Sequence, residues 1–270
     1  MKKCNCVLCS FENPKPTATA IVIKDQKLLV AKRATDPFLG QWDFPGGYVN
    51  KNETIEESLV RELKEELNTG AALHYIGAFT GTASYQNFIY PVINFAYLAE
   101  LSGTIKLNTE ENSRLKWVPI KSLKTIAFDS NRKILQYLKQ KLVFDLKEVN
   151  HLVSQLDPTA HVDEQSIYKT LLGGYVSRVT DRGKLVGMGW IFPRQTLLRK
   201  QAVVEDMIVD EKYRGKGLGE KILKDLLSWA KKEGVEVVEL TTNPKRIAAN
   251  RLYQKLGFRL HPTNHYLLKL

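Results

Sequence analysis

Cysteine is scarce in this chain, whose 270 residues include only three: Cys4, Cys6 and Cys9. Such clustered thiols favour a reduced or metal-binding state over the disulfide framework of a secreted domain. A closed structural zinc site needs four ligands and usually has a second cysteine-bearing turn, which is missing here. A fourth ligand such as His74 would have to come from the fold, so zinc stays an open hypothesis.

Long apolar runs are missing as well. The longest mostly apolar stretch, Tyr90 to Leu101, is shorter than the roughly 20 residues that a membrane-spanning helix needs. The first ten residues carry charges and cysteines in place of the apolar core of a signal peptide. We therefore expect a cytoplasmic protein without a membrane partner.

The chain also lacks any block of five or six like charges, although its net charge is +11. Residues 1–145 hold 19 Lys and Arg against 15 Asp and Glu, and residues 146–270 hold 21 against 14. An excess spread over both halves favours a solvated basic surface over a nucleic-acid-binding stripe. No nucleic-acid partner is expected, whereas small phosphate-bearing ligands remain possible in both halves.

Length and patterning predict two domains of α/β (α+β) class, because a single domain usually has about 100–200 residues. In the first half we expect strands at 17–23, 28–32, 73–80, 89–98 and 115–118, and helices at 53–67 and 131–142, with Ser130 or Asn131 as cap of the latter. In the second we expect helices at 149–156, 163–172, 220–232 and 245–256, and strands at 174–180, 184–192, 201–209, 235–241 and 265–270. The predicted organisation is a cysteine-containing segment 1–14, a domain 15–143 and a domain 144–270.

Three carboxylates share one face of the helix predicted at 53–67. Glu62, Glu65 and Glu66 stand at i, i+3 and i+4, where like charges repel unless something positive neutralises them. Oxygen-only ligands suit a hard divalent cation such as Mg²⁺ or Mn²⁺. A bare Glu-rich helix face is more often simply solvated, so the wider spacing has to decide between the two interpretations.

That spacing resembles the Nudix box: Gly47, five residues, Glu53, seven residues, then Arg61-Glu62-Leu63-Lys64-Glu65-Glu66. The departures are Asn68 for glycine and Thr69 for an apolar residue. Because Asn tolerates the left-handed conformation, we expect the helix cap to survive. The resemblance covers about residues 15–143 and implies an α/β/α sandwich that hydrolyses a nucleoside diphosphate linked to another moiety.

The resemblance also implies roles for single residues. Glu62, Glu65, Glu66 and the carbonyl of Gly46 would bind the metal, Arg61 would pair with Glu53, and Glu65 is our candidate for the base that activates water. Glu110 and Glu111 lie roughly where some relatives have a later acidic ligand. ADP-ribose, a nucleotide sugar and an oxidised nucleotide all stay open as substrates, and Trp42, Tyr85 or Tyr90 would be available to stack on a base.

In the second half a glycine-rich turn follows the strand predicted at 201–209. Converging backbone amides ahead of a helix form a pyrophosphate cradle, although a lone Gly-x-Gly turn is often only a tight bend. The run Arg214-Gly215-Lys216-Gly217-Leu218-Gly219 resembles motif A of the GNAT acetyltransferases, and Ala249 to Phe258 resembles their motif B. Together the two motifs identify residues 146–270 as a GNAT-like mixed-sheet domain that uses acetyl-CoA.

By this resemblance the amides of Arg214, Gly215, Lys216, Gly217, Leu218 and Gly219 would hold the CoA pyrophosphate, and Met207, Ile208 and Val209 its pantetheine arm. Tyr253 would protonate the leaving thiolate. Glu205 or Asp206 would deprotonate the amine; we favour Glu205 and expect only one of the two to face the cleft, because strand residues alternate. Arg246 stands where the family has Asn, and Asn243 or Asn250 would supply the missing amide.

The sequence thus predicts a bifunctional enzyme, a Mg²⁺-dependent (or Mn²⁺-dependent) Nudix hydrolase of a nucleoside diphosphate derivative joined to an acetyl-CoA-dependent N-acetyltransferase. The acceptor would be a small amine or the N-terminus or lysine of a protein. The alternative is an acetyltransferase that a nucleotide-sensing Nudix domain regulates.

Overall fold

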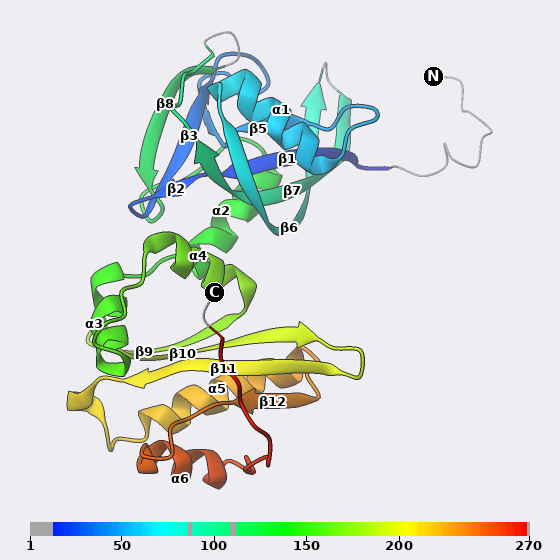
Figure 1. Ribbon diagram of the computed structural model, residues 1–270. Helices are drawn as coiled ribbons and strands as arrows, with labels where there is room; N and C mark the ends of the chain where they lie inside the picture. The colour runs from blue at the N-terminus through cyan, green and yellow to red at the C-terminus, as the bar shows by residue number, and fades with distance from the viewer. Residues whose placement is uncertain (1–12, 86–87, 109–111, 269–270) are drawn as a thin grey trace. The chain divides into compact units, whose positions relative to one another are not determined.

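The computed structural model describes residues 13–85, 88–108 and 112–268 (Figure 1). Cys4, Cys6, Cys9, Glu110 and Glu111 lie outside these residues. The chain divides into two compact units, Met1–Val143 and Phe144–Leu270, each with its own sheets and helices. No helix among the described residues is long and apolar enough to cross a membrane.

The first unit contains two sheets. One has the order β5-β1-β7-β6, from β5 (Gly46–Tyr48), β1 (Lys15–Ile21), β7 (Phe88–Ser102) and β6 (Gly70–Tyr85). The other joins β2 (Ile23–Lys24), β3 (Lys27–Arg33) and β4 (Trp42–Asp43), and β8 (Asn112–Pro119) pairs with β3. Because β1 and β7 are parallel while β1 and β5 are antiparallel, the first sheet is mixed.

The two helices of this unit cover opposite faces of the β1 sheet. Ala18 and Ala20 of β1 lie in one core cluster with the apolar stripe of α1 (Ile55–Leu67). The intervening Thr19 faces the other way and donates to Asn131 of α2 (Asp129–Lys141) at 3.5 Å. This arrangement is the layered α/β/α sandwich expected from the sequence.

The ends of α1 follow the sequence signals closely. Thr54 and Glu57 form a reciprocal capping box at its N-terminus. Asn68 takes the left-handed conformation at φ 52° and its N–H bonds carbonyls of the last turn, so the expectation that the cap survives is confirmed.

The cap expected for α2 is wrong. The helix begins earlier, at Asp129, and no side chain caps it. Ser130 and Asn131 lie inside its first turn and are buried. Asn131 donates to Asp43 Oδ1 at 2.6 Å, so a buried polar network holds a residue whose type suggested a helix cap.

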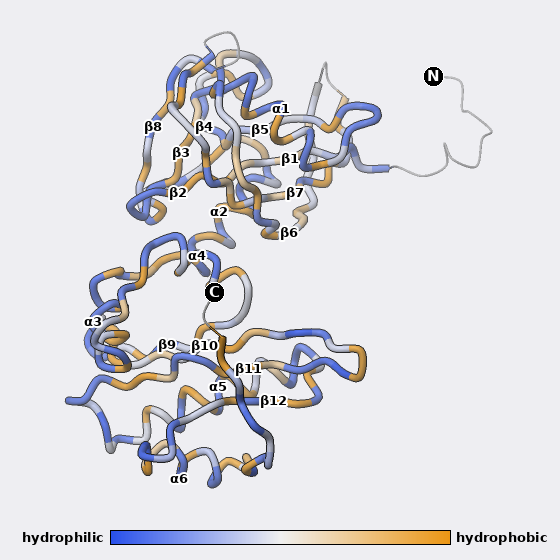
Figure 2. The backbone as a smooth tube through the Cα atoms, viewed as in Figure 1, coloured by the Kyte–Doolittle hydropathy of each residue, from blue (hydrophilic) through white to orange (hydrophobic). Residues whose placement is uncertain are grey.

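The second unit has one sheet of order β12-β11-β10-β9, with β12 (Val237–Leu240), β11 (Lys200–Val209), β10 (Lys184–Gln195) and β9 (Tyr175–Asp181). Its helices are α3 (Leu146–Leu156), α4 (Glu164–Gly173), the short 3₁₀ helix η2 (Glu211–Tyr213), α5 (Leu218–Lys232) and α6 (Ile247–Lys255). Ile222 and Leu226 of α5 form a core cluster with Ile191 and Val204 of the sheet. The alternation of hydrophobic and hydrophilic stretches along α5 is visible in Figure 2.

The closing strand predicted at 265–270 is wrong over its described part. His265 to Leu268 form no strand, and Tyr266, Leu267 and Leu268 are exposed. A strand needs a hydrogen-bonded neighbour, and within the described residues β12 pairs only with β11.

Candidate active sites

In the first unit, strand β5 brings two glycines against α1. A Cβ on Gly46, whose φ is +136°, would lie 2.1 Å from the Ala18 carbonyl oxygen, and a Cβ on Gly47 would lie 2.3 Å from Glu62 Oε1. Gly46 N–H donates to Glu66 Oε2 at 3.3 Å. Glu62 and Glu66 are only 8% and 7% exposed. The two glycines therefore allow two carboxylates of α1 to lie buried against the backbone of β5.

Arg61 binds three carboxylates at once. Its Nη2 and Nε donate to Glu53 at 2.9 and 3.1 Å, which confirms the expected pair. Its Nη1 donates to Glu62 Oε1 at 2.9 Å and to Glu65 Oε2 at 3.0 Å. The hydrogen bond from Arg61 lowers the pKa of Glu53 from 4.5 to about 2. Arg61 thus keeps Glu53 ionised and ties the loop before α1 to the helix.

The donor set fits a hard divalent cation, but the carboxylates do not converge on one point. Within the described ranges no group of three or more His, Cys, Asp and Glu side chains is arranged to hold a metal ion. Glu62 and Glu66 are buried beside Gly46 and Gly47, whereas the Glu65 side chain is 53% exposed and is held by Arg61. Carboxylate oxygens are the ligands that Mg²⁺ or Mn²⁺ prefers, and Glu65 would have to move to join Glu62 and Glu66 around such an ion.

A buried polar network on the other face of the sheet was not expected from the sequence. Asp43 is 6% exposed and accepts from Asn131, whose own Oδ1 accepts from Asn94 Nδ2 at 2.8 Å. Burial raises the pKa of Asp43 from 3.8 to about 6, although Asn131 and Arg33 act against the rise. These residues are 88 and 37 positions apart, so only the fold brings them together.

Two of the aromatic residues proposed to stack on a base have protein partners or partial burial. Tyr90 OH lies 2.7 Å from Tyr48 OH, and Lys15 Nζ lies 5.2 Å from the centre of the Tyr90 ring. Trp42 on β4 is half-buried. The side chain of Tyr85 lies outside the described part of the structure.

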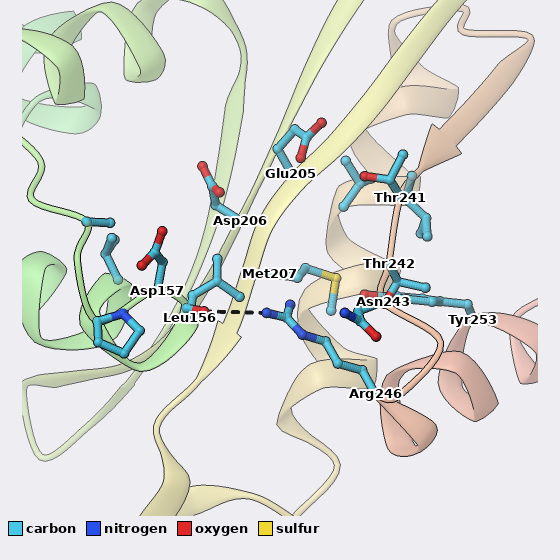
Figure 3. A pocket seen from close by; sticks show the side chains of 15 residues that line it. Leu156, Asp157, Glu205, Asp206, Met207, Thr241, Thr242, Asn243, Arg246 and Tyr253 are labelled. Carbon is cyan, nitrogen blue, oxygen red and sulfur yellow. Dashed lines mark hydrogen bonds between the residues drawn. The ribbon is translucent and has the colours of Figure 1, made fainter. Parts of the chain in front are cut away.

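In the second unit, β11 and β12 separate and leave a cavity. Their pairing runs from Gln201 opposite Val237 to Val204 opposite Leu240, where β12 ends while β11 continues to Val209. A cavity of about 730 Å³ opens at this point (Figure 3). It is lined by Val153, Leu156, Asp157, Pro158, Ala160, Val204, Glu205, Asp206, Met207, Leu240, Thr241, Thr242, Asn243, Arg246 and Tyr253. This volume lies within the range of small-molecule sites.

A β-bulge places two adjacent carboxylates on this cavity. Trp190 pairs with Glu205 and Met188 with Ile208, so β11 has one residue more than β10 between these pairs. Asp206 has φ 49°, in the left-handed region. The expectation that only one of Glu205 and Asp206 faces the cleft is wrong, because the bulge interrupts the strand alternation. Desolvation by the neighbouring protein raises the pKa of both carboxyls, although Asp206 is exposed, and the charge of Asp206 raises the pKa of Glu205 further.

Tyr253, Asn243 and Arg246 line the other side of the cavity. Burial raises the pKa of Tyr253, and the positive charge of Arg246 acts in the opposite direction. Arg246 Nη2 lies 3.5 Å from the carbonyl oxygen of Leu156, the contact drawn as a dashed line in Figure 3. Asn250 donates to the carbonyls of Asn243 and Arg246 and is not among the lining residues, so Asn243 is the amide beside the cavity.

The glycine-rich loop lies between β11 and α5. Gly215 and Gly217 have φ of +77° and +75°, and no side chain caps the N-terminus of α5. The backbone amides of this turn are therefore available to an anion. Arg214 Nε donates to the Val209 carbonyl at 3.1 Å. Of the residues expected to bind CoA, Met207 lines the cavity, while Ile208, Val209 and 214–219 lie outside its lining.

Asp210 and His151 anchor the start of this loop and were missed by the sequence reasoning. Asp210 is 1% exposed, and its Oδ2 accepts from His151 Nε2 of α3 at 2.9 Å. Its Oδ1 accepts from Lys212 N at 3.0 Å. The polar residue directly after an apolar strand was the only local signal, because the partner histidine lies 59 positions away.

Comparison with known proteins divides the chain in the same way. The family model described as NUDIX domain matches residues 13–138, and that described as Acetyltransferase (GNAT) family matches residues 142–258. An ADP-ribose pyrophosphatase of Methanocaldococcus jannaschii is 30% identical over 133 residues, which are 48% of this chain and 77% of that protein. An 8-oxo-dGTP diphosphatase of Buchnera aphidicola is 28% identical over 46% of this chain and 92% of its own length.

The second half matches a relative named as an uncharacterized N-acetyltransferase. YobR of Bacillus subtilis is 29% identical over 92 residues, 34% of this chain. The match spans 36% of the length of that relative, which is about a third.

Proposed function

The chain belongs to the Nudix hydrolases through its first unit and to the GNAT acetyltransferases through its second, and from this premise we propose a bifunctional enzyme. The first unit would hydrolyse a nucleoside diphosphate linked to another moiety, and the second would transfer an acetyl group from acetyl-CoA to an amine. The observation that carries the first activity is the buried pair Glu62 and Glu66 beside Gly46 and Gly47. The cavity that Tyr253 lines carries the second.

In the hydrolase, Glu62, Glu66 and the Gly46 carbonyl would hold a divalent metal, together with Glu65 once it leaves Arg61. Bound Mg²⁺ or Mn²⁺ supplies charge neutralisation at a pyrophosphate and lowers the pKa of water. Glu65 would take the proton from the attacking water, since it is the exposed member of the set. ADP-ribose is the first substrate to assay, because the relative from Methanocaldococcus jannaschii is named for it.

Glu65→Gln tests this assignment in the full chain. We expect hydrolysis of ADP-ribose to fall at least about 100-fold, the scale of general acid–base catalysis, with acetyl transfer unchanged. Glu57→Gln, also on α1 but in the capping box, is the matched control and should hydrolyse normally. Full hydrolysis in Glu65→Gln would refute the metal and base assignments, and 8-oxo-dGTP is the alternative substrate in the same assay.

In the acetyltransferase, the amides from Arg214 to Gly219 would hold the CoA pyrophosphate at the N-terminus of α5. The edge of β11 near Met207, which lies beyond the end of its pairing with β12, would bind the pantetheine arm. Glu205 would take a proton from the amine, which then attacks the thioester carbonyl. Tyr253 would donate its proton to the departing thiolate; its raised pKa keeps it protonated until that step.

Tyr253→Phe tests the general acid. We expect the turnover number to fall at least about 100-fold, while the Kd of acetyl-CoA changes little, since the phenyl ring keeps its packing against Phe258. Tyr175→Phe, which loses the hydroxyl that donates to Asp225 on the same unit, is the control. An unchanged rate in Tyr253→Phe would remove this residue as the acid.

A regulatory first unit is the second candidate function. It is favoured by one observation, that the three box carboxylates do not converge in the described structure. If the first unit is a sensor, adding ADP-ribose should change the acetylation rate of the Glu65→Gln variant. If it is a hydrolase, the native chain should hydrolyse ADP-ribose whether or not acetyl-CoA is present.

A further inference from the structure

The cavity between β11 and β12 is lined by carboxylates, which favour amines of particular charge. Asp157, Glu205 and Asp206 line it, against one guanidinium, that of Arg246. Three carboxylates and one cation give the lining a formal charge of −2, in a chain whose net charge is +11. The cavity and Tyr253 define the site, and the carboxylates indicate the charge of what it binds.

Two of these carboxylates have no hydrogen-bonded or ion-paired side-chain partner. Within the described residues, no side-chain hydrogen bond or ion pair involves Glu205 or Asp206, although Glu205 pairs with Trp190 in the strand ladder. Asp157 differs, because its Oδ1 accepts from Thr159 N and Oγ1 at 2.9 and 2.7 Å. Burial and the charge of Asp206 raise the pKa of Glu205, and the opposite electrostatic effect of His265 on that pKa is smaller.

The acidic groups and the acetyl-transfer groups occupy different sides of the cavity. Figure 3 shows Asp157 and Asp206 on the side of α3 and β11, and Tyr253 with Asn243 on the opposite side. Glu205 comes from the same bulge as Asp206. A ligand that reaches toward Tyr253 therefore leaves Asp206 and Asp157 beside the rest of its length.

Resting on the acetyl-transfer function proposed above, we infer that the acceptor is a small molecule with at least two amino groups. One amine loses its proton and attacks the thioester, while a second stays protonated and binds Asp206 and Asp157. Asp206 and Asp157 are exposed, so the second ammonium adds an attraction and does not relieve a buried charge. A monoamine lacks this attraction, because its only nitrogen must become neutral before it reacts.

The proposed reaction needs only the amine, acetyl-CoA, Glu205 and Tyr253 to balance. The ammonium nitrogen loses two protons in all, one through Glu205 before attack and one as the tetrahedral intermediate collapses. A bond forms between nitrogen and the acetyl carbon, and the bond from that carbon to sulfur breaks. The thiolate takes one proton from Tyr253, which regains it, and one proton is released to solvent. The second ammonium group is unchanged throughout.

Cadaverine and pentylamine test the inference, because they differ only in the terminal amino group. Thiol release from acetyl-CoA by the full chain should give a kcat/KM up to about fivefold higher for cadaverine, the scale of an exposed ion pair, because Asp157 and Asp206 are exposed. In Asp206→Asn the ratio of kcat/KM for cadaverine to that for pentylamine should fall toward one. Glu233→Gln removes an exposed carboxylate that does not line the cavity and should keep the preference.

Equal kcat/KM for the two amines, or an undiminished preference in Asp206→Asn, would overturn the inference while leaving acetyl transfer in place. Preferential acetylation of a lysine-containing peptide would also overturn it. Calorimetric titration of cadaverine into the CoA complex covers the case of slow turnover: binding that Asp206→Asn abolishes supports the inference, and no binding overturns it. Failure of acetyl-CoA itself to bind would instead refute the acetyltransferase function.

Discussion

Replacing Gly47 by alanine tests whether the space beside β5 serves the Glu62 carboxylate. The new Cβ would lie 2.3 Å from Oε1 and 2.5 Å from Cδ of Glu62. Ordinary contact begins near 3.4 Å, so the carboxylate must retreat by about 1.1 Å. The backbone of Gly47 lies outside the left-handed region and accepts alanine, so the strain falls on the side chain of Glu62.

We expect a large loss of hydrolysis with a small loss of stability. A reacting group displaced by about 1 Å commonly costs about 100-fold in rate. Because the end of a flexible side chain can move, the free energy of unfolding should fall by only about 1 kcal/mol. Gly46→Ala is the matched contrast: its Cβ would meet the backbone of Ala18 at 2.1 Å, and its φ is +136°. That variant should lose at least about 2 kcal/mol.

Hydrogen exchange of peptides from α1, read beside ADP-ribose hydrolysis, separates the two effects within one chain. Gly47→Ala should keep near-native protection of 55–67 and lose hydrolysis, whereas Gly46→Ala should lose both. Because a chain of two compact units commonly departs from two-state unfolding, a single melting temperature would not report on α1 alone. Native hydrolysis in Gly47→Ala, or exchange as fast as in Gly46→Ala, would refute the reasoning.

Further predictions concern three charged residues. Glu53→Gln should lower hydrolysis and make the free energy of unfolding less dependent on pH in acid, because folding lowers the pKa of Glu53 from 4.5 to about 2. The stabilisation from ionised Glu53 is complete above about pH 5 and is lost as the pH falls toward 2. Burial raises the pKa of Asp43 from 3.8 to about 6, so the native state binds this proton more tightly and should lose up to about 3 kcal/mol of stability as the pH rises from about 4 to 6. Asp43→Asn should abolish this loss. Urea unfolding at several pH values measures it, and parallel curves of stability against pH for the two proteins would contradict it. Arg246→Asn should move the alkaline limb of the kcat profile for acetyl transfer to higher pH, since Arg246 opposes the rise in the pKa of Tyr253; an unmoved limb would show that Tyr253 does not titrate there.

Local signals were sufficient for α1 and for the order of most elements. The apolar stripe of this helix, the Thr54 cap and the left-handed Asn68 all depend on residues within one or two turns of each other. The pair Glu53 and Arg61 follows from the same spacing. Features of this kind can be predicted because the helix geometry alone brings their members together.

The bulge in β11 could not be predicted from such signals. One extra residue on one strand changes which side chains face the cavity, and nothing in the sequence marks where it falls. Asp206, the residue at positive φ, is not the glycine that would have suggested an irregularity. The same limit applies to the described part of the tail from His265, which was predicted as a strand although the sheet of the described residues pairs no strand with it.

The carboxylates of α1 show why a correct motif can still give an incomplete physical argument. Repulsion between Glu62, Glu65 and Glu66 suggested that a metal must neutralise them, yet Arg61 already donates to two of the three. A helix face of this kind is therefore not evidence of a cation by its charge alone. What distinguishes the site is the burial of Glu62 and Glu66 against a backbone whose glycines leave room for them. Arg61 holds Glu62 and Glu65 in place, so in the proposed metal site Glu65 would have to exchange this guanidinium for the cation, and the strength of that one contact would then affect metal affinity.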